Sequence, residues 1–338
     1  MAYCSFELIL LMFLMLAFAS ASPSPTFSSF WVNELPQISL PEALRKLESP
    51  LSDSETQELL VQLKDGAPLT SSKGGSFCTE AGLYCPEKAY VSGPQPRVCI
   101  PPFFNYEYGV LPCRHPPPAA AAMHASAIFF SPASLAVGRA LQLPNISNDL
   151  QSLKLLPQSI SQALPKLKQG NLLKLTGLFG VQKGSSMELE MENTLAHCSY
   201  KSEHEIRACV TSGEDMVSFI TKAMGSKLTV YSTPLSVMES ATVVDIVKVA
   251  SRGRKVASCH NMKFPSLLFS CHMSATSELM QVSLKSTDGH TTTRPAICHM
   301  DTSYWNPSHI AFQVLNLEPG KGSVCHWFPE NSFIFVES

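Results

Sequence analysis

The sequence predicts an α+β protein, with a mostly antiparallel β domain at the C-terminal end and a small helical, disulfide-stapled module before it. Short β-branched and aromatic runs fill the last third of the chain, without the strand–helix alternation of a parallel sheet. Helical periodicity and a cluster of cysteines mark the N-terminal part. The composition, 45% hydrophobic and 15% charged, is that of a globular protein, and the net charge of −2 favours no nucleic-acid partner.

Residues 1–21 are typical of a secretory signal peptide, because an apolar run over 8–18 precedes the small residues Ala19-Ser20-Ala21. The run is too short to span a bilayer, so we expect no membrane segment after signal cleavage. Cleavage removes Cys4 and leaves ten of the 11 cysteines in an oxidising compartment, where a disulfide is the default role. The sequon at Asn145 is the candidate glycosylation site.

The N-terminal module is expected over residues 22–115, and it begins with a segment rich in proline and serine. Residues 40–64 predict two helices separated by Pro50. Ser52 and Glu55 have the spacing of a capping box at the start of the second helix. The sequence therefore predicts a small helical hairpin here.

Helical periodicity is lost after residue 67, and four cysteines follow, at Cys78, Cys85, Cys99 and Cys113. Four cysteines allow three pairings, and the sequence does not choose between them. Their spacing lacks the close cysteine pair of zinc sites, which favours disulfides over zinc. The prolines and alanines of residues 116–125 predict a linker, and residues 126–338 then form the C-terminal domain.

The C-terminal domain predicts one well-defined helix and a series of strands. Ser212 is a suitable N-cap, acidic residues fill the first turn, and Gly225 ends the helix. Residues 188–192 suit either an exposed strand or the start of a helix. The predicted strands are 128–130, 228–231, 243–249, 264–271, 279–284, 291–298, 310–315 and 333–336.

The dipeptide Cys-His occurs four times in the last eighty residues, with 10, 25 and 25 residues between successive pairs. The four pairs are Cys259-His260, Cys271-His272, Cys298-His299 and Cys325-His326. Adjacent side chains on a strand point to opposite faces, so each cysteine and its histidine would separate if the pairs lie on strands. Four thiols on one side could then close two disulfides, with Cys198 and Cys209 as a further candidate pair.

The four histidines have two interpretations. His260, His272, His299 and His326 could converge on a metal ion, and a site made only of imidazole nitrogen favours copper(II) over structural zinc. A buried histidine can equally be a hydrogen-bonded residue of the core. The sequence leaves both readings open.

The spacing of the four Cys-His pairs resembles that of the plant BURP domain. Phe129-Phe130 resembles the paired phenylalanines that open this domain, and Cys198 and Cys209 match two further cysteines of the family. Residues 209–217 are similar to the family's Cys-x-Thr-Ser-x-Glu-x-Met stretch, so the likeness covers about residues 126–338.

The region before the linker resembles, more weakly, the non-catalytic beta subunit of polygalacturonase isozyme 1. That subfamily carries a long array of Phe-x-x-Tyr repeats, whereas this chain has only Phe103-Phe104-Asn105-Tyr106. The resemblance implies a secreted, non-enzymatic protein of the apoplast or cell wall that acts in development or stress response. Pectin and polygalacturonase are the candidate partners, and a basic cluster at Arg252, Arg254 and Lys255 could meet a polyanionic pectin or could simply be solvated.

The resemblance also implies an alternative. Some BURP proteins are copper-dependent, autocatalytic peptide cyclases, and by resemblance the four Cys-His histidines would be the copper ligands. Such enzymes cross-link a Tyr or Trp of a core peptide that is often carried on the same chain. We find no repeated peptide ending in Tyr or Trp within residues 22–125 and no catalytic residue set, so the non-enzymatic function ranks first.

Overall fold

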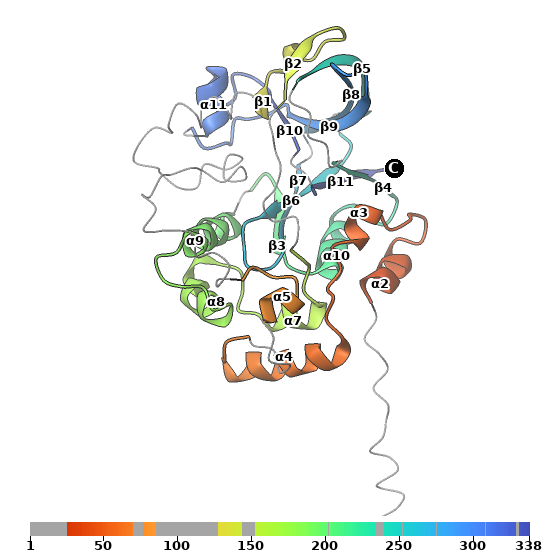
Figure 1. Ribbon diagram of the computed structural model, residues 1–338. Coiled ribbons are helices and arrows are strands. Elements are labelled where there is room, and N and C mark those ends of the chain that lie inside the picture. Colours follow the sequence, from red (N-terminus) through yellow and green to blue (C-terminus); the bar gives the residue numbers. More distant parts are fainter. Residues whose placement is uncertain are drawn as a thin grey trace, which may run out of the picture.

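We describe the protein from a computed structural model, shown in Figure 1. The residues that the structure describes are 26–69, 77–85, 128–143, 153–201, 203–233, 240–251, 253–274, 276–307, 309–328 and 331–338. Within these ranges, no helix combines the length and the apolar character needed to cross a bilayer. The predicted signal peptide, the predicted linker and Asn145 lie outside the described residues.

The larger of two sheets has six strands in the order β1-β10-β9-β8-β5-β2, and every neighbouring pair is antiparallel. Its strands are β1 (Phe129–Phe130), β2 (Ala140–Gln142), β5 (Ser240–Ala250), β8 (Ser277–Ser286), β9 (Thr291–His299) and β10 (Val324–Trp327). β5 shifts register against β8 at two places, which bends the long strands so that they curl in the upper part of Figure 1.

The second sheet has five strands in the order β3-β7-β6-β11-β4, also antiparallel throughout. Its strands are β3 (Ile206–Val210), β4 (Leu228–Ser232), β6 (Val256–Met262), β7 (Leu268–Ser274) and β11 (Phe333–Glu337). Leu279 and Ile297 of the first sheet share one buried cluster with Val256, Ile334 and Val336 of the second. The two sheets therefore pack against each other, and the predicted α+β class with mainly antiparallel sheets is confirmed.

The N-terminal helices are α2 (Phe27–Glu34), α3 (Glu42–Arg45), α4 (Asp53–Asp65) and the short α5 (Phe77–Glu80). The Ser52 side chain accepts from the Glu55 backbone N–H and the Glu55 carboxylate accepts from the Ser52 backbone N–H, so the predicted capping box is present. α2 was not predicted, because only the Thr26 cap distinguishes this proline- and serine-rich segment from a loop. The helical part of the N-terminal module is thus confirmed for the described residues.

These helices pack directly on the five-stranded sheet. Trp31 of α2 and Leu44 of α3 are fully buried, in one cluster with Val217 of α10 (Gly213–Met224) and Phe335 of β11. Figure 1 shows α2, α3 and α10 together beside that sheet. The N-terminal segment therefore completes the core of the C-terminal domain.

A second group of helices covers the lower end of the molecule in Figure 1. α7 (Gln158–Ala163), α8 (Leu172–Leu178) and α9 (Ser186–Ser199) share a buried cluster with α4 and with the segment joining β6 to β7. Two short 3-10 helices lie at Pro132–Ser134 and Gln169–Asn171. α9 contains residues 188–192, so the helical alternative predicted for them is the one observed.

The predicted strand over 310–315 is wrong, because these residues form helix α11 (Ile310–Leu315). The Nδ1 atom of His309 accepts a hydrogen bond of 3.1 Å from the Ala311 backbone N–H, and this cap starts the helix. Asn316 ends it in the left-handed conformation, which asparagine tolerates better than most residues. Local capping thus overrides the β propensity of this apolar run.

Four disulfides lie within the described residues, and they join Cys78–Cys85, Cys198–Cys209, Cys259–Cys271 and Cys298–Cys325. The Cys78–Cys85 disulfide is one of the pairs allowed by the three pairings that the sequence left open for the N-terminal module. Cys99 and Cys113 lie outside the described residues.

Candidate metal centre

Strand alternation separates the cysteines from the histidines on β6 and β7. Cys259 lies directly opposite Cys271, with 4.0 Å between their Cα atoms, and the disulfide joins the two strands. His260 lies opposite Ser270, and His272 lies opposite Ser258, on the other face of the same strand pair. Both histidines are at most 4% exposed.

The same arrangement recurs on β9 and β10 of the other sheet. Cys298 lies opposite Cys325, with 3.9 Å between Cα atoms, and their disulfide joins these strands. His299 and His326 project from the opposite face, and Phe129 of β1, which pairs with His326, joins them there. Each sheet thus carries one disulfide and two buried imidazoles.

The separation of cysteine and histidine follows the predicted alternation, but the four pairs do not share one sheet. Cys259 and Cys271 face the cluster that includes Trp31. Cys298 and Cys325 face a different cluster, which includes Val243. The expectation of four thiols on one side is therefore wrong, because the two disulfides occupy the outer faces of two sheets.

The four imidazoles meet between the two sheets. Ring centroids are separated by 5.5 Å for His260 and His272, 6.5 Å for His272 and His299, 5.4 Å for His299 and His326, and 6.1 Å for His326 and His260. The Nε2 atoms of His299 and His326 are 3.3 Å apart. All four histidines named from the sequence are thus brought together.

The Nδ1 atoms of three rings face polar groups at the edge of the site. Nδ1 of His326 donates to the Trp327 carbonyl at 3.1 Å, and Nδ1 of His299 lies 3.2 Å from the Ser277 hydroxyl. Nδ1 of His272 lies 3.7 Å from a carboxylate oxygen of Glu205, an ion-pair contact too long for a hydrogen bond. Histidines that bind a metal through Nε2 characteristically engage carbonyl or carboxylate groups through Nδ1.

The donor chemistry of this cluster fits a transition-metal ion. Imidazole nitrogens about 2.0–2.1 Å from one ion lie roughly 3.3 Å apart in a tetrahedral site and roughly 2.9 Å apart at neighbouring positions of a square-planar site, so the 3.3 Å between His299 and His326 is close to both. In the part of the chain that the structure describes, no three His, Cys, Asp or Glu side chains already converge on a single metal position. Neighbouring imidazoles that share one ion have centroids roughly 4.5–5 Å apart, so binding by all four histidines requires shifts of roughly 1–2 Å.

Aromatic side chains surround the cluster. The Phe328 ring stacks on His260 at a centroid distance of 5.3 Å, and Trp305 meets His299 edge-on at 5.0 Å. Phe328 follows His326 by two residues, so alternation alone would have placed it on the histidine face. No comparable pattern in the sequence points to Trp305, which approaches from a loop, or to Glu205, which lies immediately before β3.

Glu205 is the buried acidic residue beside the histidines, and its side chain is 1% exposed. Burial raises the pKa of its carboxyl, but the contact with His272 and the nearby His299 and Arg207 together lower it, and the net pKa lies below the ordinary value. The carboxylate is therefore ionised and places a negative charge next to the cluster.

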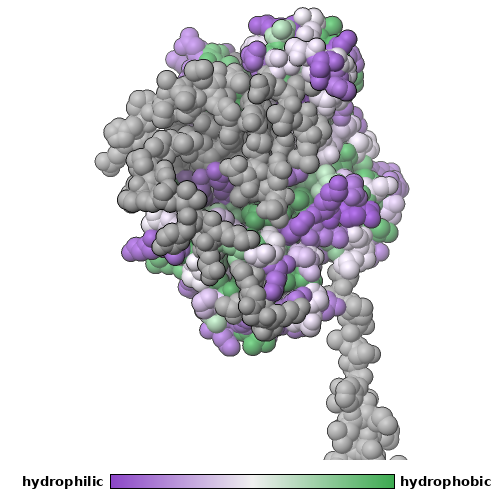
Figure 2. All heavy atoms as spheres, viewed as in Figure 1, coloured by the Kyte–Doolittle hydropathy of each residue, from purple (hydrophilic) through white to green (hydrophobic). Residues whose placement is uncertain are grey.

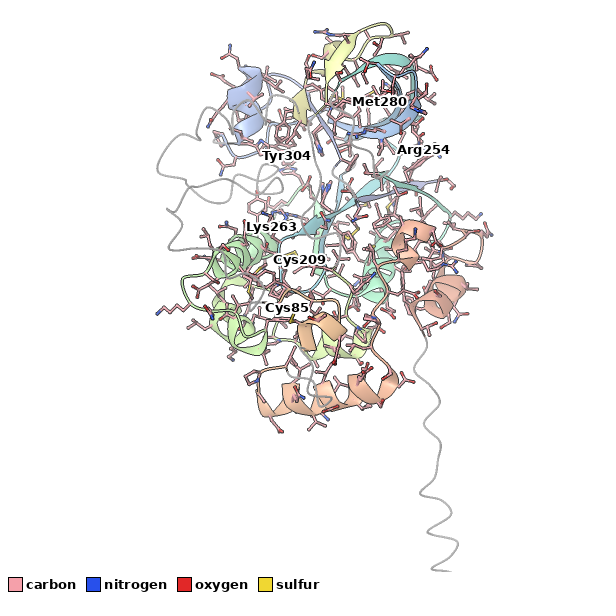
Figure 3. All side chains as sticks on the ribbon, in the orientation of Figure 1. Cys85, Cys209, Arg254, Lys263, Met280 and Tyr304 are labelled. Atoms are coloured by element: carbon pink, nitrogen blue, oxygen red, sulfur yellow. A yellow bond between two sulfur atoms is a disulfide. The ribbon has the colours of Figure 1, made fainter. Side chains whose placement is uncertain are left out.

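Among the described residues, the basic side chains in and near the cluster expected to meet pectin, which include Lys248 and Lys263 beside Arg254 and Lys255, do not form one uncompensated patch. Lys248 lies 2.8 Å from Glu278, and Lys255 lies 3.8 Å from Glu337. Arg254 precedes β6 and Lys263 follows it, and Figure 3 shows these two labelled residues well apart. Arg252 lies outside the described residues.

On the face shown in Figure 2, a group of hydrophilic side chains lies away from this basic cluster. Figure 2 shows a hydrophilic patch where Figure 1 places α3. Glu42 of this helix pairs with Arg45 at 3.6 Å and with Lys46 at 3.9 Å, and all three side chains are exposed. Opposite charges therefore alternate on this surface.

The chain is thus a protein of two antiparallel sheets, in each of which paired cysteines and histidines alternate along neighbouring strands. Residues 128–337 match the BURP domain, and the chain belongs to the BURP domain family.

Three relatives illustrate the likeness. BURP domain-containing protein 16 of Oryza sativa is 29% identical, over 93% of this chain and 90% of its own length. BURP domain-containing protein BNM2A of Brassica napus is 33% identical, over 62% of this chain and 79% of its own length. Polygalacturonase 1 beta-like protein 2 of Arabidopsis thaliana is 34% identical, over 60% of this chain but only 33% of its own length.

Proposed function

We propose that this BURP protein is a secreted, non-enzymatic protein of the apoplast or cell wall, acting in development or stress response, whose two sheets hold one transition-metal ion. The main observation behind this proposal is the set of four buried imidazoles, in which the Nε2 atoms of His299 and His326 lie 3.3 Å apart across neighbouring strands. When bound, such an ion supplies a strong cross-link between elements distant in the sequence. His260 and His272 would hold it from one sheet, and His299 and His326 from the other.

Copper(II) is the preferred ion, because the donor set is imidazole alone. The cysteines nearest to the histidines are oxidised in disulfides on the outer faces of the sheets, so they offer no thiolate. Zinc structural sites commonly use thiolates, whereas imidazole suits copper well. The hydrogen bonds at Nδ1 of His326 and His299 support ligation through Nε2.

Secretion is supported by the disulfides. Four disulfides within the described residues require an oxidising compartment, and intracellular thiols are normally kept reduced. The predicted signal peptide and the sequon at Asn145 agree with that compartment. Secretion of the full chain into plant medium, with loss of residues 1–21 in the mature mass, is the direct test.

The non-enzymatic function is supported by the positions of the buried carboxylates. Glu205 and Glu214 are the buried acidic residues of the described chain. Glu205 faces the histidines, whereas Glu214 belongs to α10, which packs on the opposite face of the same sheet. They cannot act together as the acid and base of a glycoside hydrolase.

A wall partner is suggested by one relative, whose name associates it with a polygalacturonase beta subunit. Polygalacturonase or its substrate pectin is accordingly the proposed partner class. Co-sedimentation of the secreted protein with pectin, and co-purification with a polygalacturonase, would distinguish the two. Failure of both would remove the partner while leaving the metal proposal intact.

Metal analysis tests the central proposal. The secreted protein is purified without chelators, loaded with copper(II) or zinc, desalted and analysed for bound metal. We expect one copper per chain and a signal typical of nitrogen ligands in electron paramagnetic resonance. His299→Ala should lose the ion, and His290→Ala should retain it because this histidine is exposed in the turn between β8 and β9. Equal copper in both variants, or none in the wild type, contradicts the proposal.

The alternative is a copper-dependent peptide cyclase, and one observation favours it. The nitrogen-only cluster is buried and lies against Trp305, an environment that suits redox chemistry at a metal. Intact-mass measurement after adding copper(II) in air tests it, because each cross-link removes two hydrogens in a two-electron oxidation for which dioxygen or excess copper(II) would be the electron acceptor. A loss of about 2 Da per cross-link would replace the non-enzymatic function by the cyclase.

A further inference from the structure

We propose that Glu205 is a positioning residue of the histidine cluster, which holds the His272 ring through Nδ1 and turns its Nε2 toward the other three imidazoles. This inference rests on the proposed metal-binding function and extends it to a residue that does not belong to a Cys-His pair. The observation behind it is the 3.7 Å contact between His272 Nδ1 and a Glu205 oxygen in a site where both side chains are at most 2% exposed.

The fold fixes Glu205 on the histidine face. Arg207 of β3 lies directly opposite His272 of β7. Glu205 precedes Arg207 by two residues, so the alternation of an extended chain sends both side chains to the same face. The disulfide between Cys198 and Cys209 ties β3 to α9 and limits any sliding of this strand.

The burial of Glu205 is unfavourable unless the carboxylate has a role. Neither of its oxygens makes a hydrogen bond within the described structure, and burying a charge without such bonds is strongly destabilising. The contact with His272 and the nearby charges of His299 and Arg207 together offset this burial. The groups that hold the carboxylate therefore belong to the histidine cluster and to the strand beside it, which ties Glu205 to this site.

A carboxylate next to a ligand histidine has a known effect on metal sites. It fixes the ring tautomer with the proton on Nδ1, leaves Nε2 as the donor, and raises the basicity of the ligand. Loss of such a partner typically weakens metal binding 10- to 100-fold. If Glu205 acts in this way on His272, replacing it should weaken metal binding by a factor in this range.

The test compares Glu205→Gln with the wild type in two measurements on the full secreted chain. Copper(II) affinity, measured by competition with a chelator, should fall about 10- to 100-fold. The melting temperature of the metal-free protein is measured beside it, so that the affinities are compared per folded molecule. A purely structural role predicts a changed melting temperature with unchanged affinity per folded molecule, and that pattern would overturn the inference.

Glu214→Gln is the matched control, because it also removes a buried carboxylate but on the far face of the same sheet. Its copper affinity should equal that of the wild type. Equal weakening in both variants would show a general electrostatic effect and would refute a specific role for Glu205.

A metal-free measurement separates this inference from the proposed function. Nitrogen chemical shifts of His272 should report the proton on Nδ1 in the wild type and a changed tautomer in Glu205→Gln. Copper binding without that change overturns the positioning role and leaves the metal site standing. If the tautomer of His272 changes in Glu205→Gln but the wild type binds no copper, the proposed function is overturned while the contact between Glu205 and His272 is supported.

Discussion

The imidazole of His260 lies nearly parallel to the ring of Phe328, with 5.3 Å between centroids and 14° between planes. His260 belongs to one sheet, and Phe328 immediately follows β10 of the other, so this stack joins the two sheets beside the histidine cluster. Phe328 is 1% exposed and belongs to the cluster between the sheets. The aromatic ring therefore both fills the interface and limits the rotation of His260.

Replacing this ring should destabilise the protein markedly. Phe328→Ala is expected to lower the free energy of unfolding by about 3–5 kcal/mol, because it leaves a cavity in a close-packed interface. Urea denaturation measures the change. Val137→Ala, at a side chain that is 65% exposed, should change it by less than about 0.5 kcal/mol. Similar values for both variants would mean that the interface relaxes around the missing ring.

Gly213 permits the close approach of α2 to α10. A Cβ atom at this position would lie 2.5 Å from the nearest atom of the buried Phe27 ring. We expect Gly213→Ala to lower the free energy of unfolding by about 1–3 kcal/mol through this overlap, despite the better helix propensity of alanine. Thermal denaturation of the full chain tests the prediction.

The control is Gly177→Ala in α8, where an added Cβ would meet nothing within 4 Å. That variant should gain about 0.5–1 kcal/mol. Adding Phe27→Leu should partly rescue Gly213→Ala, since the smaller side chain vacates the overlap. No rescue would show that the strain lies in the backbone and not at the Phe27 ring.

Glu214 should make stability depend on pH between about 4.5 and 6. Burial raises the pKa of this carboxyl to about 6, backbone hydrogen bonding at the helix start opposes the rise, and the charges of Asp215 and Glu48 add to it. The folded state therefore binds the proton more tightly than the unfolded state. Its stability falls as the pH rises from about 4.5 through about 6, and the loss is complete above that.

Glu214→Gln removes this dependence because the amide does not ionise. The variant should be more stable than the wild type by about 1–2 kcal/mol at pH 7–8, with little difference below about pH 4. Melting temperatures across this pH range measure the effect. Glu318→Gln, at an exposed position, should follow the wild type at every pH. A constant gain at all pH values would rule out ionisation as its cause.

The disulfide of the six-stranded sheet should contribute more to stability than that of the other sheet. Cys298 and Cys325 are separated by 27 positions, and Cys259 and Cys271 by 12. Closing the longer loop restricts the unfolded chain more, by about 3.5 against about 3 kcal/mol in the chain-entropy treatment. Paired Cys→Ala variants and urea denaturation compare them, and a reversed order would show that packing around each pair outweighs loop length.

Local rules in the sequence were sufficient for several elements. Ser212 and Gly225 delimit α10, and the capping box at Ser52 starts α4, because caps act within a few residues. The alternation of cysteine and histidine also follows from strand geometry alone. The apolar residues of 310–315 suit either a strand or a helix, and the sequence pattern alone does not indicate that His309 caps a helix there.

Features that depend on contacts between segments distant in the sequence could not be predicted from local sequence patterns. The distribution of the four pairs over two sheets depends on strand order, which the spacing of 10, 25 and 25 residues does not encode. Glu205 reaches the cluster only because β3 pairs with β7 in one particular register. Trp31 is buried by α10 and by the end of the chain, and no local pattern predicts those contacts.

If the four histidines bind one ion, each sheet would supply a separate pair of its ligands. A covalent bond between the preceding cysteines fixes the spacing within each pair, so it does not depend on the other sheet. Only the packing of the sheets brings the pairs together. An ion shared by all four rings would therefore be released when the sheets part, even if both strand pairs stay intact, and the rate of its release would report the rate of that opening.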